Sequence, residues 1–199
     1  MNRFVLTGAP GSGKTAILRQ LEVDGPEALG AGSVGGIGGT GGMLGVVEEA
    51  ATDVIALAQA QGVDEPWQQP DFPETIAALQ RRRQLTADRI RGDGPLFFDR
   101  SPVCTYALAQ FLGHPVGPVL AAELDRVRAE HVYERRVFFV VGQGFLTPTP
   151  ARRITPEDAA RFEELHAKVY RSLGYELVMV EPGPLDVRAG FVRARASTT

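Results

Sequence analysis

A glycine-rich stretch near the start of the sequence carries its clearest chemical signal. It matches the pattern G-x-x-x-x-G-K-[ST] at every defined position. Its residues are Gly8, Ala9, Pro10, Gly11, Ser12, Gly13, Lys14 and Thr15. The glycines let backbone N–H groups turn inward around an anion, Lys14 can reach β- and γ-phosphate oxygens, and Thr15 can place its hydroxyl on Mg²⁺. An apolar run precedes the pattern and a helical pattern follows it, so we predict a loop that binds ATP and Mg²⁺.

A second oxygen ligand for the metal is expected, because the Thr15 hydroxyl alone is neutral. The segment PLFFDRSP supplies Asp99 at the end of an apolar run, where α/β sheets place their ligands. Arg100 follows and keeps its charge, so it could clamp a phosphate or orient an acceptor. The alternative is that Asp99 and Arg100 cap the next helix and form a surface pair. Beside a complete phosphate-binding loop we favour the functional interpretation.

Two acidic residues, Glu48 and Glu49, follow another apolar run. At least one of them could face the cleft and take the proton of an acceptor hydroxyl. The alternative is an acidic first helical turn, which the helix dipole favours. The pattern alone does not separate these two interpretations.

Arginines occur in two further places. Arg152 and Arg153, in PARRIT, follow the fourth predicted strand; on a loop they could close over the transferring phosphoryl group and neutralise its charge. The alternative is a solvated basic turn, and we favour the lid. The run LQRRRQ (79–84) is expected mainly at the surface, because successive helical residues point in different directions and at most one or two can face the cleft.

The elements that would position these side chains alternate along the chain. Apolar runs predict strands at 3–7, 43–47, 94–99, 135–141 and 175–180. Helical patterns lie at 14–22, 48–62, 73–90, 101–112, 117–132 and 155–174. In the last of these, Thr155 can cap the helix and Pro156 suits its first turn. The alternation predicts a doubly wound α/β fold with a mainly parallel sheet.

Composition narrows the class of protein. The 199 residues fit one domain, and a net charge of −3 gives no sign of an extended nucleic-acid surface. A single cysteine, Cys104, excludes an intrachain disulfide and a multi-cysteine zinc site. No stretch has the length of a membrane span, so we expect a cytoplasmic protein. The glycine-rich segment 25–45 is expected to be a flexible insertion, with a functional lid as the alternative.

Several segments together resemble a known family. They are LTGAPGSGKTAIL, VVEEAATDVIAL, FFDRSPVCTYALA, ARRIT and FEELHAKVYRSLGYELVMV, in this order. They are similar to a family of small bacterial proteins labelled AAA-family ATPases. In fold that family is closer to P-loop kinases, such as the ribosylnicotinamide kinase domain and the deoxynucleoside kinases. The resemblance covers nearly the whole chain except 25–45.

The resemblance implies a P-loop three-layer α/β sandwich with a five-stranded sheet in the order 2-3-1-4-5. It implies that Asp99 lies on the strand beside the phosphate-binding loop and that Glu49, rather than Glu48, is the carboxylate on the acceptor side. It places Arg100 in a motif similar to the acid-Arg-Ser motif of nucleoside kinases. It also places Arg152 and Arg153 in a lid at about 143–155.

These observations favour a phosphotransferase that moves the γ-phosphoryl group of ATP to a hydroxyl of a small molecule. A nucleoside-like acceptor is expected by analogy only. The alternative is a nucleotide-binding switch or regulatory ATPase that acts through a protein partner. GTP use is disfavoured because no N/T-K-x-D motif is evident. We expect a monomer or homodimer that binds neither nucleic acid nor a membrane.

Overall fold

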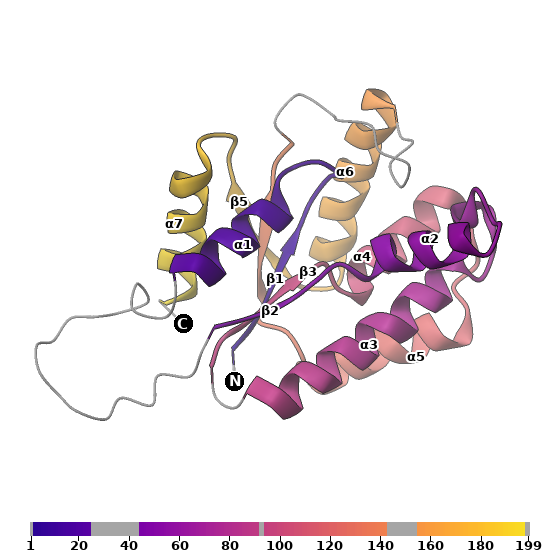
Figure 1. Cartoon of the computed structure of the whole chain (residues 1–199), viewed down its shortest axis with the longest axis horizontal. Coiled ribbons are helices and arrows are strands. Elements are labelled where there is room, and N and C mark those ends of the chain that lie inside the picture. The colour runs from indigo at the N-terminus through magenta and orange to yellow at the C-terminus, as the bar shows by residue number, and fades with distance from the viewer. Residues whose placement is uncertain (1, 25–43, 92–93, 143–154, 198–199) are drawn as a thin grey trace, which may run out of the picture.

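Five parallel strands form the centre of the computed structural model, which describes residues 2–24, 44–91, 94–142 and 155–197 (Figure 1). The strands are β1 (Arg3–Thr7), β2 (Gly45–Val47), β3 (Leu96–Asp99), β4 (Arg136–Val140) and β5 (Glu176–Val180). Their order is β2-β3-β1-β4-β5, and each neighbouring pair is parallel. The order 2-3-1-4-5 expected from the resemblance is therefore confirmed.

Helices connect the strands and cover the sheet. They are α1 (Lys14–Asp24), α2 (Ala50–Ala60), the short 3₁₀ helix η2 (Pro66–Gln68), α3 (Phe72–Arg91), α4 (Pro102–Leu112), α5 (Pro118–Ala129), α6 (Pro156–Ser172) and α7 (Leu185–Ala196). The cap predicted for α6 is confirmed, since the Thr155 side chain accepts a hydrogen bond from the Asp158 N–H at 3.1 Å. Helix α7 was not expected from the sequence.

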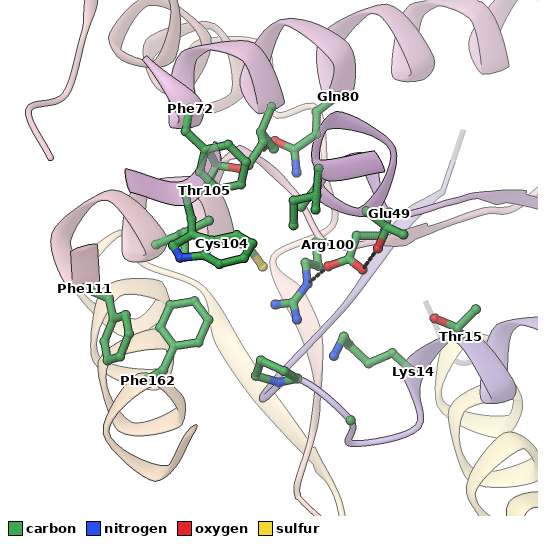
Figure 2. Close-up of a pocket in the computed structure, with 18 of the residues that line it drawn as sticks. Lys14, Thr15, Glu49, Phe72, Gln80, Arg100, Cys104, Thr105, Phe111 and Phe162 are labelled. Atoms are coloured by element: carbon green, nitrogen blue, oxygen red, sulfur yellow. Dashed lines mark hydrogen bonds and ion pairs between the residues drawn. The ribbon is translucent and has the colours of Figure 1, made fainter. Parts of the chain in front are cut away.

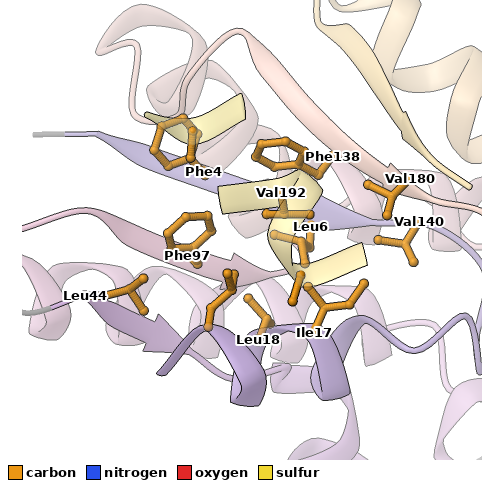
Figure 3. Close-up of a cluster of buried hydrophobic side chains, with 13 residues drawn as sticks. Phe4, Leu6, Ile17, Leu18, Leu44, Phe97, Phe138, Val140, Val180 and Val192 are labelled. Carbon is orange, nitrogen blue, oxygen red and sulfur yellow. The ribbon is translucent and has the colours of Figure 1, made fainter. Parts of the chain in front are cut away.

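One face of the sheet packs on α1 and α7 (Figure 3). Ile17 and Leu18 of α1 and Val192 of α7 are almost fully buried there against Phe4 and Phe138 of the strands. The apolar residues of α1 recur at helical spacing, so one side of that helix is removed from water. Because α1 begins at the end of the phosphate-binding loop, this packing holds the loop against the sheet.

The opposite face of the sheet packs on α4 and α6. Val103 and Ala107 of α4 and Phe162 and Val169 of α6 are buried against residues such as Phe98. Both sides of the strands are therefore covered, as the continuous apolar runs of the sequence predict for a parallel sheet. Helices α2 and α3 lie beside the β2 end of the sheet (Figure 1).

The strand register brings the candidate residues to one edge of the sheet. Leu6 of β1 is level with Asp99 of β3, and Val47 of β2 is level with Phe98. The loops that follow these three strands carry the phosphate-binding motif, Arg100 and Glu49. Parallel strands thus direct all of these groups to the carboxyl edge, where open α/β sheets bind ligands.

Some expectations concern residues that lie outside the described part of the chain. They are most of the glycine-rich segment 25–45 and most of the lid at 143–155, with Arg152 and Arg153 in it. Among the helices that are described, none is long and apolar enough to cross a membrane.

Candidate functional site

The phosphate-binding loop joins β1 to α1 and depends on glycine at several positions. Gly8, Gly11 and Gly13 have φ values of 127°, 78° and 91°, a region that residues with a Cβ rarely adopt. At Gly8 a Cβ would also lie 2.2 Å from the carbonyl oxygen of Val140 in β4. The glycines of the motif are therefore required by backbone geometry, as a loop that wraps closely around an anion demands.

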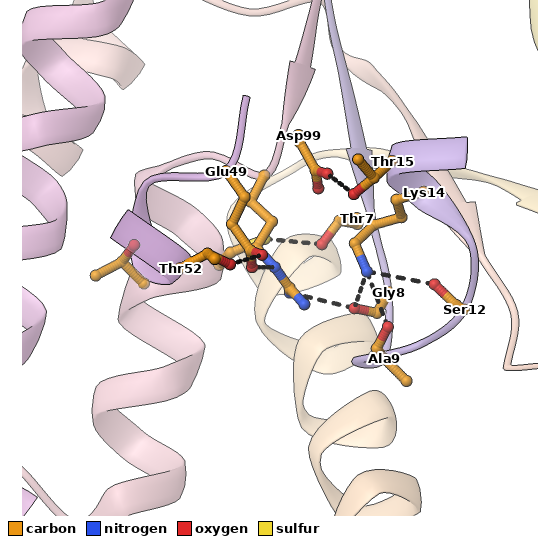
Figure 4. Close-up of polar contacts among 12 residues, drawn as sticks. Thr7, Gly8, Ala9, Ser12, Lys14, Thr15, Glu49, Thr52 and Asp99 are labelled. Carbon is orange, nitrogen blue, oxygen red and sulfur yellow. Dashed lines mark hydrogen bonds and ion pairs between the residues drawn. The ribbon is translucent and has the colours of Figure 1, made fainter. Parts of the chain in front are cut away.

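Lys14 begins α1, and its ammonium group lies inside this loop. Its Nζ donates hydrogen bonds to the carbonyl of Ala9 at 2.8 Å, the carbonyl of Gly8 at 3.3 Å and the Ser12 hydroxyl at 3.3 Å (Figure 4). Burial and the nearby Arg100 guanidinium lower the pKa of Lys14 from 10.5 to about 8. A buried ammonium group held only by neutral oxygens is well placed to gain from an anionic ligand.

Thr15 and Asp99, the two predicted metal ligands, lie in contact. The Thr15 hydroxyl donates to Oδ2 of Asp99 at 2.7 Å (Figure 4). Asp99 is buried, and its Oδ1 has no hydrogen-bond partner among the described residues. Burial raises the pKa of Asp99 above its ordinary value, although Lys14 opposes the rise. A hydroxyl beside a carboxylate with an unsatisfied oxygen fits the oxygen ligands that Mg²⁺ prefers.

Arg100 connects the loop to Glu49. Its backbone is left-handed, with a φ of 73°, which is uncommon for a residue with a side chain. Its Nε donates to Oε1 of Glu49 at 2.5 Å, and its Nη1 donates to the Gly8 carbonyl at 3.2 Å. One guanidinium therefore contacts the phosphate-binding loop and the acidic residue at the same time.

Of the two neighbouring acidic residues, Glu48 is exposed and Glu49 faces the site. The Thr52 hydroxyl donates to Oε2 of Glu49 at 2.9 Å. Burial alone would raise the pKa of Glu49, but the Arg100 and Lys14 charges and the hydrogen bonds from Thr52 and Arg100 outweigh it. The pKa of Glu49 falls to about 2, so the carboxylate is ionised at neutral pH.

Arg83 on α3 holds the backbone of this segment in place. Its Nη1 donates to the carbonyls of Glu48 and Glu49 at 3.0 and 2.8 Å, and its Nη2 pairs with Asp53. Of the run LQRRRQ, expected mainly at the surface, Arg83 thus points toward the site. Arg81 instead pairs with Glu123, away from these contacts.

A cavity of about 710 Å³ opens between the phosphate-binding loop and helices α2, α3, α4 and α6. Figure 2 shows Lys14 and Thr15 at one end and Phe111 and Phe162 at the other, with Arg100 between them. The walls are mainly apolar and aromatic. They include Ile55, Trp67, Phe72, Ile76, Leu108, Phe111, Leu112 and Phe162.

Two polar residues interrupt these apolar walls where α3 packs against α4. Gln80 and Thr105 both line the cavity, and the Thr105 hydroxyl donates to Oε1 of Gln80 at 2.8 Å. This bond fixes the amide so that its NH₂ group remains available as a donor. Sequence reasoning missed both residues, although Phe72, Ile76 and Gln80 recur every four positions and so share one side of α3.

Known proteins show similarity at the level of family and fold. Residues 3–188 match the model of a protein family described as an AAA domain. The fold is similar to that of a deoxyadenosine kinase from M. mycoides, solved with the products dCMP and a flexible dCDP bound. That likeness has a TM-score of 0.62 and covers 99% of this chain and 100% of the other, at 10% sequence identity. No curated protein matches the chain in sequence.

Proposed function

We propose that this chain, which belongs to the AAA domain family and has the fold of a P-loop kinase, transfers the γ-phosphoryl group of ATP to a hydroxyl of a small molecule. The observation that carries the proposal is the position of Glu49. Its ionised carboxylate lies on the wall of the cavity and is joined through Arg100 to the phosphate-binding loop. A carboxylate in that position can hold an acceptor hydroxyl facing the terminal phosphate.

The phosphate-binding loop supplies the donor side of the reaction. Residues 8–15 surround the phosphates, and Lys14 exchanges its bonds to neutral oxygens for bonds to β- and γ-phosphate oxygens. Thr15 and Asp99 would hold Mg²⁺, which when bound neutralises phosphate charge. Arg152 and Arg153 are proposed to close over the transferring group.

Glu49 and Arg100 supply the acceptor side. A carboxylate whose pKa is about 2 is a weak base, so its main contribution is to accept a hydrogen bond from the hydroxyl and orient it. This suits phosphoryl transfer, because a loose transition state needs positioning and charge stabilisation more than early proton removal. Arg100 fixes Glu49 and adds positive charge beside the transferring group.

The cavity walls favour an acceptor that contains a flat ring. Phe72, Phe111 and Phe162 offer aromatic surfaces. The NH₂ of Gln80 donates no hydrogen bond to another described residue, so it can donate to an oxygen or ring nitrogen on the edge of the ring. The volume of about 710 Å³ lies within the range of small-molecule sites. A nucleoside-like metabolite combines such a ring with a free hydroxyl.

The test is ATP turnover with a panel of nucleosides, sugars and other hydroxylated metabolites, with products identified by mass spectrometry. We expect one ring-containing compound to gain a single phosphoryl group and to accelerate ADP formation. The Gln80→Leu variant should lose preference among ring-containing acceptors while its affinity for ATP stays the same. Bound ATP that is hydrolysed slowly with every compound would instead favour a regulatory ATPase acting through a protein partner.

A further inference from the structure

Arg188 lies on α7, far along the chain from the phosphate-binding loop, yet it contacts that loop directly. Its Nη2 donates a hydrogen bond to the carbonyl oxygen of Ser12 at 2.6 Å, across 176 positions of sequence. The side chain is only 3% exposed, and Ser12 is fully buried. This contact approaches the loop from outside the cavity, since Arg188 is not among the residues that line it.

The contact determines the direction of one backbone N–H group. In a planar trans peptide, the C=O and the N–H of the next residue point in opposite directions. The carbonyl of Ser12 and the N–H of Gly13 belong to the same peptide unit. Because Arg188 holds the carbonyl toward α7, the Gly13 N–H is directed to the opposite side of that peptide. In a loop of this type, that side is where inward-turned N–H groups gather around the phosphates.

Burying an arginine to hold α7 against the sheet costs desolvation free energy. No carboxylate of the described residues forms an ion pair with Arg188, and its Nε is buried without a hydrogen-bond partner there. The apolar residues Ala189 and Val192 of the same helix already pack into the core. Within the described residues, this buried cation exchanges its hydration for one hydrogen bond and no carboxylate, which packing alone does not account for.

We infer that Arg188 is a positioning residue for the phosphate-binding loop, one that orients the Ser12–Gly13 peptide and adds positive charge behind the anion site. This inference rests on the proposed nucleotide binding by residues 8–15. It assigns Arg188 to phosphate affinity rather than to recognition of the base or of the acceptor.

The experiment compares wild type, Arg188→Met and Arg193→Met by calorimetric titration with Mg–ATP and with magnesium tripolyphosphate. Arg193 is the matched control, because it lies on the same helix and joins it to α1 through Asp24 without touching the loop. We expect Arg188→Met to lower the affinity for both ligands by the same factor, about tenfold. Losing the orientation of one N–H donor to a charged phosphate, that of Gly13, implies an effect of this size. Arg193→Met should bind both ligands as the wild type does.

A second measurement separates positioning from general stability. In a ¹⁵N spectrum, the Gly13 amide of the wild type should move strongly when tripolyphosphate binds, and this shift should shrink in Arg188→Met. If the methionine variant does not fold, Arg188→Lys keeps a buried cation and should show an intermediate loss of affinity.

Three results would overturn the inference. The first is an Arg188 variant, methionine or lysine, that binds both ligands as tightly as the wild type. The second is a loss confined to ATP, which would assign Arg188 to the nucleoside portion. The third is an equal loss of affinity in Arg193→Met, which would mean that the packing of α7 against α1, and not the Ser12 contact, determines ligand affinity. Failure of the wild type to bind either ligand would refute the proposed function itself, and is thus distinct from these three.

Discussion

Thr15 donates its hydroxyl hydrogen to Oδ2 of Asp99, and the other oxygen of that carboxylate is buried without a hydrogen-bond partner among the described residues. The two groups reach this contact from different elements, since Thr15 is in the first turn of α1 and Asp99 ends β3. Two adjacent oxygen donors, one of them incompletely satisfied, are the kind of pair that a small hard cation such as Mg²⁺ takes as ligands, which supports the proposed metal site.

Thr15→Val and Asp99→Asn should each reduce the magnesium-dependent part of ATP affinity. Asp99→Asn is expected to have the larger effect, because it removes the charged ligand. The double variant should be little worse than Asp99→Asn alone, since both residues serve one ion. ATP titrations with Mg²⁺ and with EDTA measure this difference. Full magnesium dependence in Asp99→Asn would show that the metal is held elsewhere.

ATP binding should take up a proton at mildly alkaline pH. In the ligand-free protein the pKa of Lys14 is about 8, and triphosphate favours the charged amine, so binding raises this pKa. The contribution of Lys14 to affinity should therefore be constant below pH 7 and fall as the pH rises above 8. At pH 8, calorimetry in two buffers of different ionisation enthalpy should show uptake of about half a proton. Lys14→Arg, which stays charged, should show none, and equal uptake in that variant would assign the proton to another group.

Glu49→Gln should slow phosphoryl transfer by roughly 10²-fold while ATP affinity changes little, because the acceptor hydroxyl is no longer well oriented. The substitution keeps the size of the side chain but removes the charge that orients the acceptor hydroxyl. Thr52→Val is the matched control, because it removes one hydrogen bond to Glu49 and leaves the carboxylate in place. Single-turnover transfer and ATP titration separate the two steps. Loss of ATP binding in Glu49→Gln would place this residue on the donor side instead.

Arg83→Gln should lower the transfer rate about tenfold without changing ATP affinity, because Arg83 holds the carbonyls of Glu48 and Glu49 and so aims the Glu49 side chain. Arg82→Gln, one position earlier on the same helix, should transfer at the wild-type rate. The measurement is kcat and KM for each substrate. Equal losses in the two variants would show that a positive charge on α3, rather than the contact of Arg83, matters.

The central strands β1, β3 and β4 were predictable because they are buried on both faces and therefore appear as continuous apolar runs. The edge strands β2 and β5 are only partly buried, but their apolar residues still gave a recognisable run. The strand ends also indicated Asp99 and one of Glu48 and Glu49, since polar residues that follow such runs gather at the carboxyl edge of a parallel sheet. The choice of Glu49 over Glu48 came from the family resemblance. Helix α7 was missed because its sequence, LDVRAGFVRARA, has arginines and a glycine among its apolar residues and shows only a weak helical pattern. Its buried side is completed by packing against α1.

The remaining site residues required the folded structure. Gln80, Arg83 and Thr105 lie inside helices, where the rotation of each helix decides which residues meet the cavity. The run LQRRRQ shows this clearly, because Arg83 reaches the Glu49 segment while Arg81 pairs with Glu123. Local sequence contains no information on contacts of this kind, which join positions more than thirty residues apart.

The contact between Ser12 and Arg188 also bears on how the site is assembled during synthesis. The phosphate-binding motif leaves the ribosome well before the helix that holds its Ser12 carbonyl, because Arg188 lies 176 positions further along the chain. A nascent chain can therefore contain the whole motif and still lack the support of that loop. Tight nucleotide binding would then indicate that the polypeptide has folded through to α7, and the ligand would stabilise chains that include this helix in preference to shorter precursors.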